Sequence, residues 1–259
     1  MCIRDRGASG QDNLQKYVLR LGDNALILGQ QVSAWCGHAP ALEEDIAFAN
    51  VALDLIGQAT NWLNYAAELN AEPTTADNLA FLRGEREFSN VLLVEQPNKN
   101  FGHSLMRQFL FDCWHYPMLQ ALASSKDKHI SEIAQKSVKE VAYHLERSTD
   151  LIIRLGDGTN ESHDRMQNAL NALWRFTGEL HTADALDNLM QEDGIAPDLA
   201  KVGEAFQSYL DKVLPLAMLK IPENALMRSG GKAGIHSEVM GPLLAEMQHL
   251  QRSYPGATW

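Results

Sequence analysis

Cysteine and long apolar runs are both scarce in this sequence of 259 residues. Three cysteines, Cys2, Cys36 and Cys113, are far apart and form no CxxC pair, which excludes a disulfide framework and favours a reducing cytoplasm. No apolar run reaches the roughly 18 residues of a transmembrane helix, so we expect no membrane association. The first ten residues lack the apolar segment of a signal peptide. We therefore predict a cytoplasmic protein.

Positive charge is also in short supply. The chain has 22 Lys and Arg against 33 Asp and Glu, a net charge of -11. Because such a chain repels phosphate backbones, nucleic acid is not an expected partner. The sequence has no P-loop, no G-x-G-x-x-G after a strand and no recognisable nucleophile elbow, so nucleotide-fold enzymes and serine or cysteine hydrolases are not indicated.

Helical periodicity is what the sequence has in abundance. Apolar residues recur at steps of three and four in segments that predict long helices, and no segment shows a strand pattern. In the second of these segments we expect Ile46, Ala49, Leu53, Ile56 and Ala59 to share one face of the helix. The helices are expected at residues 14–35, 43–69, 101–124, 128–155, 162–191, 198–214 and 237–253.

This arrangement predicts an all-α protein in which two long hairpins form a four-helix bundle with extra C-terminal helices. We expect residues 14–259 to form a single domain. Residues 1–13 are interpreted as a disordered or spurious extension.

Long helical bundles often hold carboxylate-bridged di-iron sites, which need Glu residues and Glu-x-x-His pairs pointing inward. Asp112-x-x-His115 and Glu246-x-x-His249 have this spacing, and Glu140 lies on the same helix face as His144. The helix at 43–69 has no histidine, and its polar candidates for the interior are Asn50, Asp54 and Gln58. The plainer interpretations are an exposed helix face for Glu246 and His249, and for His144 a core histidine bonded to Glu140 or Asp112.

The glycine-rich segment 230–234 leaves two interpretations open. Its backbone N–H groups and the Lys232 ammonium could bind an anion. Glycine-rich segments are also typical of mobile connectors.

Several stretches spread along the chain resemble one family. Together they resemble the C subunits of bacterial phenylacetyl-CoA epoxidases, also called ring 1,2-phenylacetyl-CoA monooxygenases, over about residues 14 to 259. The stretches are Leu19-Arg20-Leu21-Gly22-Asp23-Asn24, Trp35-Cys36-Gly37-His38-Ala39-Pro40, Leu53-Asp54-Leu55-Ile56-Gly57-Gln58-Ala59, Glu87-Phe88-Ser89-Asn90, Leu93-Val94-Glu95-Gln96-Pro97-Asn98, Leu173-Trp174-Arg175-Phe176-Thr177, Gly231-Lys232-Ala233-Gly234-Ile235-His236 and Leu244-Ala245-Glu246-Met247-Gln248-His249-Leu250-Gln251-Arg252.

The resemblance implies a ferritin-like fold and a non-catalytic, structural role. In that family the catalytic subunit carries the di-iron centre and epoxidises the CoA-linked ring, while the structural subunit pairs with it and maintains it. A reductase subunit delivers electrons from NADPH. The resemblance thus implies no cofactor, no catalytic residue and no metal ligand in this chain, with self-association as a further expectation.

The resemblance also locates a vestigial metal site. The catalytic relatives carry a Lys-Glu-Glu-x-x-His-like string, and the matching run here is residues 139–144. Val141 replaces a ligand carboxylate while His144 remains, and Asp112 on the preceding helix is expected to face it. Ile56 and Ala59 stand at the ligand positions of the helix at 43–69. Replacing a carboxylate by valine removes charge and donor atoms, so metal affinity should collapse.

Substrate contact is implied by the resemblance at two segments. Both are expected near phenylacetyl-CoA at the interface between the catalytic and structural subunits, and ordinary interface packing is the alternative interpretation. The residues are Glu87, Phe88, Ser89 and Asn90 in the first segment and Asn188, Leu189 and Met190 in the second.

Three functions follow from these patterns. The first is a structural subunit of phenylacetyl-CoA epoxidase in aerobic phenylacetate degradation. The second is an independent di-iron oxygenase or oxidase with a degenerate site, and the third, weaker one is a carrier module for CoA thioesters. The second would use Asp112, Glu140, His144, Glu246 and His249.

Overall fold

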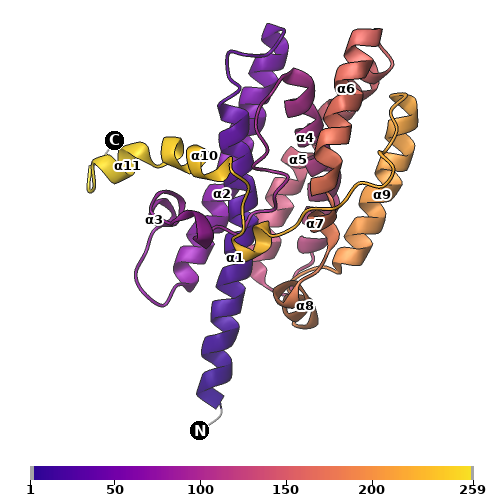
Figure 1. Ribbon diagram of the computed structural model, residues 1–259. Helices are drawn as coiled ribbons and strands as arrows, with labels where there is room; N and C mark the ends of the chain where they lie inside the picture. The colour runs from indigo at the N-terminus through magenta and orange to yellow at the C-terminus, as the bar shows by residue number, and fades with distance from the viewer. Residues whose placement is uncertain (1–2, 258–259) are drawn as a thin grey trace.

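A computed structural model describes residues 3–257, and every regular element within that range is a helix (Figure 1). The predicted all-α bundle with extra C-terminal helices is therefore confirmed. The α-helices are α1 (Ile3–Ser33), α2 (Leu42–Leu69), α3 (Ala76–Phe81), α4 (Phe101–Leu122), α5 (Lys128–Gly156), α6 (Asn160–Leu173), α7 (Gly178–His181), α8 (Ala185–Glu192), α9 (Leu199–Leu216), α10 (Met240–Met247) and α11 (His249–Ser253). The 3-10 helices are η1 (Glu85–Glu87), η2 (Trp174–Phe176) and η3 (Gly231–Ala233).

Two helical hairpins form the body of the molecule. Helix α1 packs along α2, helix α4 packs along α5, and α2 meets α5, while α6 and α9 pack against α4 (Figure 1). Large side chains such as Tyr17, Leu55, Trp62 and Phe109 are buried between the helices. Removing this apolar surface from water is the main term that stabilises the fold. None of the helices in the described range is long and apolar enough to cross a membrane.

Side-chain caps set where several helices begin. Asn100, Asp127, Thr159 and Asp198 each accept a hydrogen bond from a backbone N–H in the first turn of α4, α5, α6 and α9. Asp127 also accepts the hydroxyl of Tyr65 at 2.7 Å, which ties α2 to the start of α5. The caps therefore fix the positions of α4 and α5, the helices that hold the interior polar groups described below.

The predicted single helix over residues 162–191 is wrong. The chain instead forms α6, η2, α7 and α8. Asp184 starts α8 through a reciprocal pair of bonds, because its side chain accepts from the N–H of Asp187 while the Asp187 side chain accepts from the N–H of Asp184. Before it, Thr177 bonds back to the carbonyl of Trp174 at the end of η2. These local caps outweigh the helical periodicity.

Three residues of the expected apolar face of α2 are exposed, whereas Ala59 of the same face is buried. Ile46, Leu53 and Ile56 are 53%, 66% and 38% exposed. Phe48 and Trp62 lie on the buried face and are 1% exposed each. Helix α2 thus carries two apolar stripes, and the stripe with the aromatic residues is the one that packs inward.

The C-terminal segment forms an arm rather than one helix. The predicted helix over 237–253 is divided into α10 and α11 near Gln248 (Figure 1). Gln248 donates to the carbonyls of Ala80 and Arg83, and Arg252 donates to the carbonyls of Phe81, Leu82 and Arg83. The arm is therefore fastened to the C-terminal end of α3 and the residues after it.

The predicted boundary after residue 13 is not marked by a change in secondary structure, because α1 already begins at Ile3. Residues 1 and 2 of the predicted extension lie outside the described residues. That residues 1–13 are a disordered or spurious extension stays a prediction.

Candidate functional site

Polar side chains from three helices meet in the middle of the bundle, where the resemblance places the vestigial metal site. We call them the bundle-centre cluster. Helix α2 contributes two residues, α4 two and α5 three. The cluster consists of Asp54, Gln58, Gln108, Asp112, Glu140, His144 and Ser148.

Asp112 is completely buried and bonded only to neutral groups. One oxygen accepts from Gln108 Nε2 at 2.7 Å and the other from Ser148 Oγ at 2.9 Å. Burial raises the pKa of Asp112 to about 6, although the two hydrogen bonds and the nearby His144 oppose the shift. Each oxygen of this carboxyl is thus already bonded to a neighbouring side chain.

His144 is 1% exposed, and its partner differs from the two predicted. Its Nε2 lies 2.9 Å from Asp54 of α2, so the expected bond to Asp112 or Glu140 is wrong. Glu140 instead accepts from Gln58 Nε2 at 3.0 Å. The packing of α2 against α5 brings Asp54, rather than an acid of α4 or α5, within reach of the imidazole.

The donor set of this cluster does not fit a di-iron centre. Val141 is fully buried on α5 and offers no donor atom. On α2, Gln58 supplies an amide, Ala59 is buried and Ile56 is partly exposed. Within the part of the chain that the structure describes, no group of three or more His, Cys, Asp or Glu side chains is arranged to hold a metal ion.

The other predicted ligand pairs are separated. His115 is buried on α4, where burial and the nearby His144 lower its pKa to about 3, so the ring is neutral. Glu246 and His249 are exposed on α10 and α11, in the arm attached to the end of α3. The structure does not assemble the five residues that the independent di-iron alternative requires.

A second polar region lies where residues 83–98 meet residues 228–239, and we call it the loop network. Glu95 is completely buried at its centre and uses both oxygens. One accepts from the N–H of Ser237 at 2.6 Å, and the other from His236 Nδ1 at 2.8 Å and Asn90 Nδ2 at 3.1 Å. Residues more than 130 positions apart in sequence are thereby joined.

His236 links the same two segments through both ring nitrogens. Its Nε2 lies 3.0 Å from the carbonyl of Phe88, and its Nδ1 faces Glu95. A carbonyl and a carboxylate both accept, so the ring carries both protons. Burial opposes this charge, but the bonds to Glu95 and Phe88 outweigh it and raise the pKa of His236.

The glycine-rich segment 230–234 does bind an anion, but the anion is the protein's own Glu179. One Glu179 oxygen accepts from the N–H groups of Gly230 at 3.0 Å and Lys232 at 3.1 Å, and the other accepts from the N–H of Leu92 at 2.9 Å. A Cβ at Gly231 would lie 2.2 Å from the carbonyl oxygen of Asn90, so only glycine fits there. The segment therefore fits neither interpretation, because its N–H groups bind a carboxylate of the same chain and this bond holds the segment in place.

Buried charge pairs complete the loop network. Arg20 donates to Asp184 at 2.6 Å and to Asp187 at 2.8 Å, and Lys232 donates to Asp187 at 2.9 Å. We did not predict Arg20, Asp187 or Glu179 from the sequence, because their partners lie on other elements. Two further residues, Asp23 and Arg83, form an ion pair that also holds the N–H of Ser89.

The residues predicted to contact substrate occupy different environments. Glu87, Phe88 and Ser89 line a cavity of about 270 Å³ between η1, α1 and η3. Asn90 is fully buried and does not line the cavity, and Met190 is 1% exposed in the core. The other two, Asn188 and Leu189, are exposed on α8 and do not line this cavity. Their role in substrate binding stays a prediction.

The fold and this site define a helical-bundle protein whose interior carboxylates are bonded to its own side chains and backbone. The family described as phenylacetic acid catabolic protein matches residues 4–259, and the chain belongs to that family. It is similar to the C subunit of the 1,2-phenylacetyl-CoA epoxidase of Escherichia coli (strain K12). The two are 49% identical over 248 residues, which cover 96% of this chain and 100% of that protein.

Proposed function

We propose that this chain is a non-catalytic structural subunit of a phenylacetyl-CoA 1,2-epoxidase, a multicomponent monooxygenase of aerobic phenylacetate degradation. Its similarity to the C subunit along the whole of that protein supports this role. In the proposed complex the chain pairs with, and stabilises, a catalytic subunit that carries the di-iron centre. A reductase subunit supplies the electrons, and the complex works in the cytoplasm.

The main observation in support of a non-catalytic role is the donor set of the bundle-centre cluster. Val141 occupies the position where the resemblance implies a ligand carboxylate, and it is fully buried. Asp112 and Glu140 are occupied by hydrogen bonds to Ser148 and Gln58. The carboxylates of the cluster are therefore bonded within the chain, and in our proposal the catalytic subunit carries out the oxygen chemistry.

An exposed apolar stripe supports docking to a partner subunit. Helix α2 presents Leu42, Ile46, Leu53 and Ile56 to solvent, and Leu42 and Leu53 are 71% and 66% exposed. On α5, which packs against α2, Tyr143 is 54% exposed. Lasting subunit interfaces bury large apolar areas, and we assign this α2 stripe to the contact with the catalytic subunit. Self-association of the chain would use the same surface.

The acyl-CoA lies near this chain in the proposed complex. Glu87 and Ser89 line the small cavity next to η3 and are the predicted residues best placed for contact. The exposed Asn188 and Leu189 would reach the ligand or the partner from α8.

Co-purification tests the pairing. The chain and a di-iron catalytic subunit of the epoxidase are expressed together and passed over a size-exclusion column, and iron is measured in the separate chain and in the complex. We expect co-elution, with iron following the catalytic subunit. Separate elution would overturn the structural role, and about two irons per copy of the isolated chain would favour the independent oxygenase.

A matched pair of variants tests the stripe. Leu53→Arg places a charge in the α2 stripe, whereas Leu216→Arg places one at a site on α9 that is 61% exposed. We expect the first to abolish co-elution and the second to leave it intact. Equal behaviour of the two variants would exclude the α2 stripe as the docking surface.

A further inference from the structure

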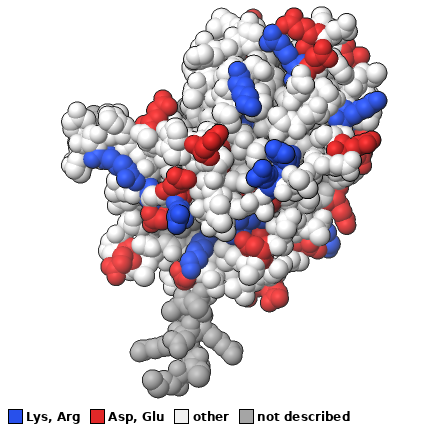
Figure 2. Space-filling model, viewed as in Figure 1, with Lys and Arg blue, Asp and Glu red and all other residues white. Residues whose placement is uncertain are grey.

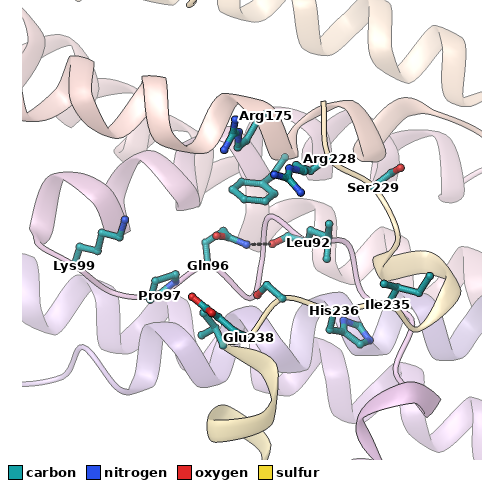
Figure 3. Close-up of a pocket in the computed structure, with 13 residues that line it drawn as sticks. Leu92, Gln96, Pro97, Lys99, Arg175, Arg228, Ser229, Ile235, His236 and Glu238 are labelled. Atoms are coloured by element: carbon teal, nitrogen blue, oxygen red, sulfur yellow. Dashed lines mark hydrogen bonds between the residues drawn. The ribbon is translucent and has the colours of Figure 1, made fainter. Parts of the chain in front are cut away.

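A cavity beside the loop network has no role in the proposals above. Its volume is about 620 Å³, within the range of small-molecule sites (Figure 3). Its walls come from four separate parts of the chain. The lining residues used below are Lys99, Arg175, Phe176, Arg228, Ile235 and Glu238.

Three of these side chains are cations without an acidic partner. In the described part of the chain, Lys99, Arg175 and Arg228 form no ion pair and donate no side-chain hydrogen bond to another residue. By contrast, the more deeply buried Arg20 and Arg83 are both paired with carboxylates. Three unpaired cations thus line a cavity with one carboxylate, Glu238, in a protein whose net charge is -11. Figure 2 shows basic and acidic side chains interspersed with uncharged surface on the face in view.

The two arginines are held next to each other by the backbone. The N–H of Arg228 donates to the carbonyl of Arg175 at 2.7 Å, which joins the segment after α9 to η2. Figure 3 shows both side chains on one wall of the cavity and Lys99 on another. Like charges on one wall repel each other, and a bound anion would offset this repulsion.

We propose that this cavity binds the phosphate-bearing end of a coenzyme A thioester. Arginine guanidinium groups match phosphate oxygens with paired N–H donors, and Lys99 adds a third positive charge. Phe176 and Ile235 line the same cavity and provide apolar surface against which a purine base packs. The inference rests on the proposed function for the identity of the coenzyme, while the anion site follows from the charges and the cavity.

The cavity favours a small phosphorylated molecule over an acidic peptide. Peptides generally lie along an exposed strand edge or in an apolar groove. Here the cations line a concave space next to Pro97 and Leu92, which are partly or wholly buried. The remainder of the thioester extends out of the cavity.

Titration calorimetry on the full chain tests the site with four probes. They are coenzyme A, 3′,5′-ADP as its nucleotide end, pantetheine as its phosphate-free arm, and inorganic phosphate. We expect coenzyme A and 3′,5′-ADP to bind with similar affinity, inorganic phosphate to bind far more weakly and pantetheine not to bind. Binding should weaken as salt is raised.

A charge-matched pair of double variants locates the site. Arg175→Gln with Arg228→Gln should weaken coenzyme A binding at least about tenfold, because charge-assisted bonds are lost. Lys201→Gln with Lys212→Gln removes the same charge from exposed positions on α9 and should leave binding unchanged. Both variants should keep the melting temperature of the parent, since all four side chains are exposed.

Three results would overturn the site. They are no binding at millimolar coenzyme A, equal binding by both double variants, and binding of a hexaglutamate peptide in place of coenzyme A. Co-elution with the catalytic subunit is measured on the same variants. If coenzyme A binds here but the chain does not pair with the catalytic subunit, the site stands and the proposed function fails. If the chain pairs with the catalytic subunit but does not bind coenzyme A, the proposed function stands and the site fails.

Discussion

The bundle-centre cluster and the loop network use buried carboxylates in opposite ways. In the bundle centre, Asp112 and Glu140 accept from neutral amide and hydroxyl groups, and several atoms there, including Gln58 Oε1, Gln108 Oε1 and His144 Nδ1, have no partner. In the loop network, Glu95 and Glu179 accept hydrogen bonds from backbone N–H groups that lie far from them in the sequence. We therefore expect a larger loss of stability when a carboxylate that binds backbone N–H groups is replaced than when one that binds only side chains is replaced.

The largest effect is expected from Glu179→Ala. The change leaves the buried N–H group of Leu92 and the partly buried N–H groups of Gly230 and Lys232 without their acceptor. At about 1–3 kcal/mol for each of the three orphaned donors, we expect the free energy of unfolding to fall by roughly 3–9 kcal/mol, measured by urea denaturation. The exposed Glu204→Ala is the control and should change stability by less than about 0.5 kcal/mol. Similar losses of unfolding free energy in the two variants would show that the hydrogen bonds of Glu179 do not stabilise the fold.

The next largest effect is expected from Val141→Glu in the bundle centre. The new carboxylate would be buried with no cation opposite it, and we expect a loss of at least about 3 kcal/mol. Iron binding should not return, because α2 still offers Gln58 and no histidine. Metal analysis and urea denaturation check both statements, with Tyr143→Glu at an exposed position of α5 as control. Stoichiometric iron in the variant would refute the view that the centre lacks more than one ligand.

A smaller effect is expected from the charge on His236. Its folded pKa is raised above the unfolded value of about 6.5, so its contribution to stability is complete below pH 6.5 and is lost as pH rises through the folded pKa. His103 and His115, whose pKa values are lowered to about 4 and about 3 largely by burial, act in the opposite sense and only below about pH 6.5. Denaturation curves above pH 6.5 should therefore show a decline that His236→Gln removes. An unchanged decline in the variant would assign it to another group.

The smallest effect is expected from Asp112→Asn. Burial already disfavours the ionised carboxyl, as the pKa of about 6 indicates, and asparagine keeps one oxygen for Ser148 or Gln108. We expect a change within about 1 kcal/mol at pH 7 by urea denaturation. A loss as large as that of Glu179→Ala would erase the contrast between the two regions.

Much of the fold is visible in the sequence because its signals are local. Asn100, Thr159 and Asp198 are caps at the expected helix starts, and the positions of the long helices follow from apolar periodicity. The face of α2 could not be predicted from periodicity, since Leu53 and Leu55 belong to two rival apolar stripes. Only contact with α1 and α5 decides which one is buried.

The polar partners were harder to predict because they join distant segments. Nothing near His144 in the sequence indicates Asp54, which is 90 positions away, and nothing near the glycines at 230–234 indicates Glu179. Residue types suggested an anion site at the glycines, and they were right about the chemistry. The source of the anion depends on how the whole chain folds.

The clasp between the C-terminal arm and the end of α3 has a consequence for sequence drift. Gln248 and Arg252 bond to carbonyl oxygens of residues 80–83, and every amino acid supplies that oxygen. Side chains at Phe81 and Leu82 can therefore vary over generations without loosening the arm. Gln248 and Arg252 have no such freedom, because their side chains donate these bonds. Substitutions should therefore be tolerated on the α3 side of this contact and not on the side of the arm.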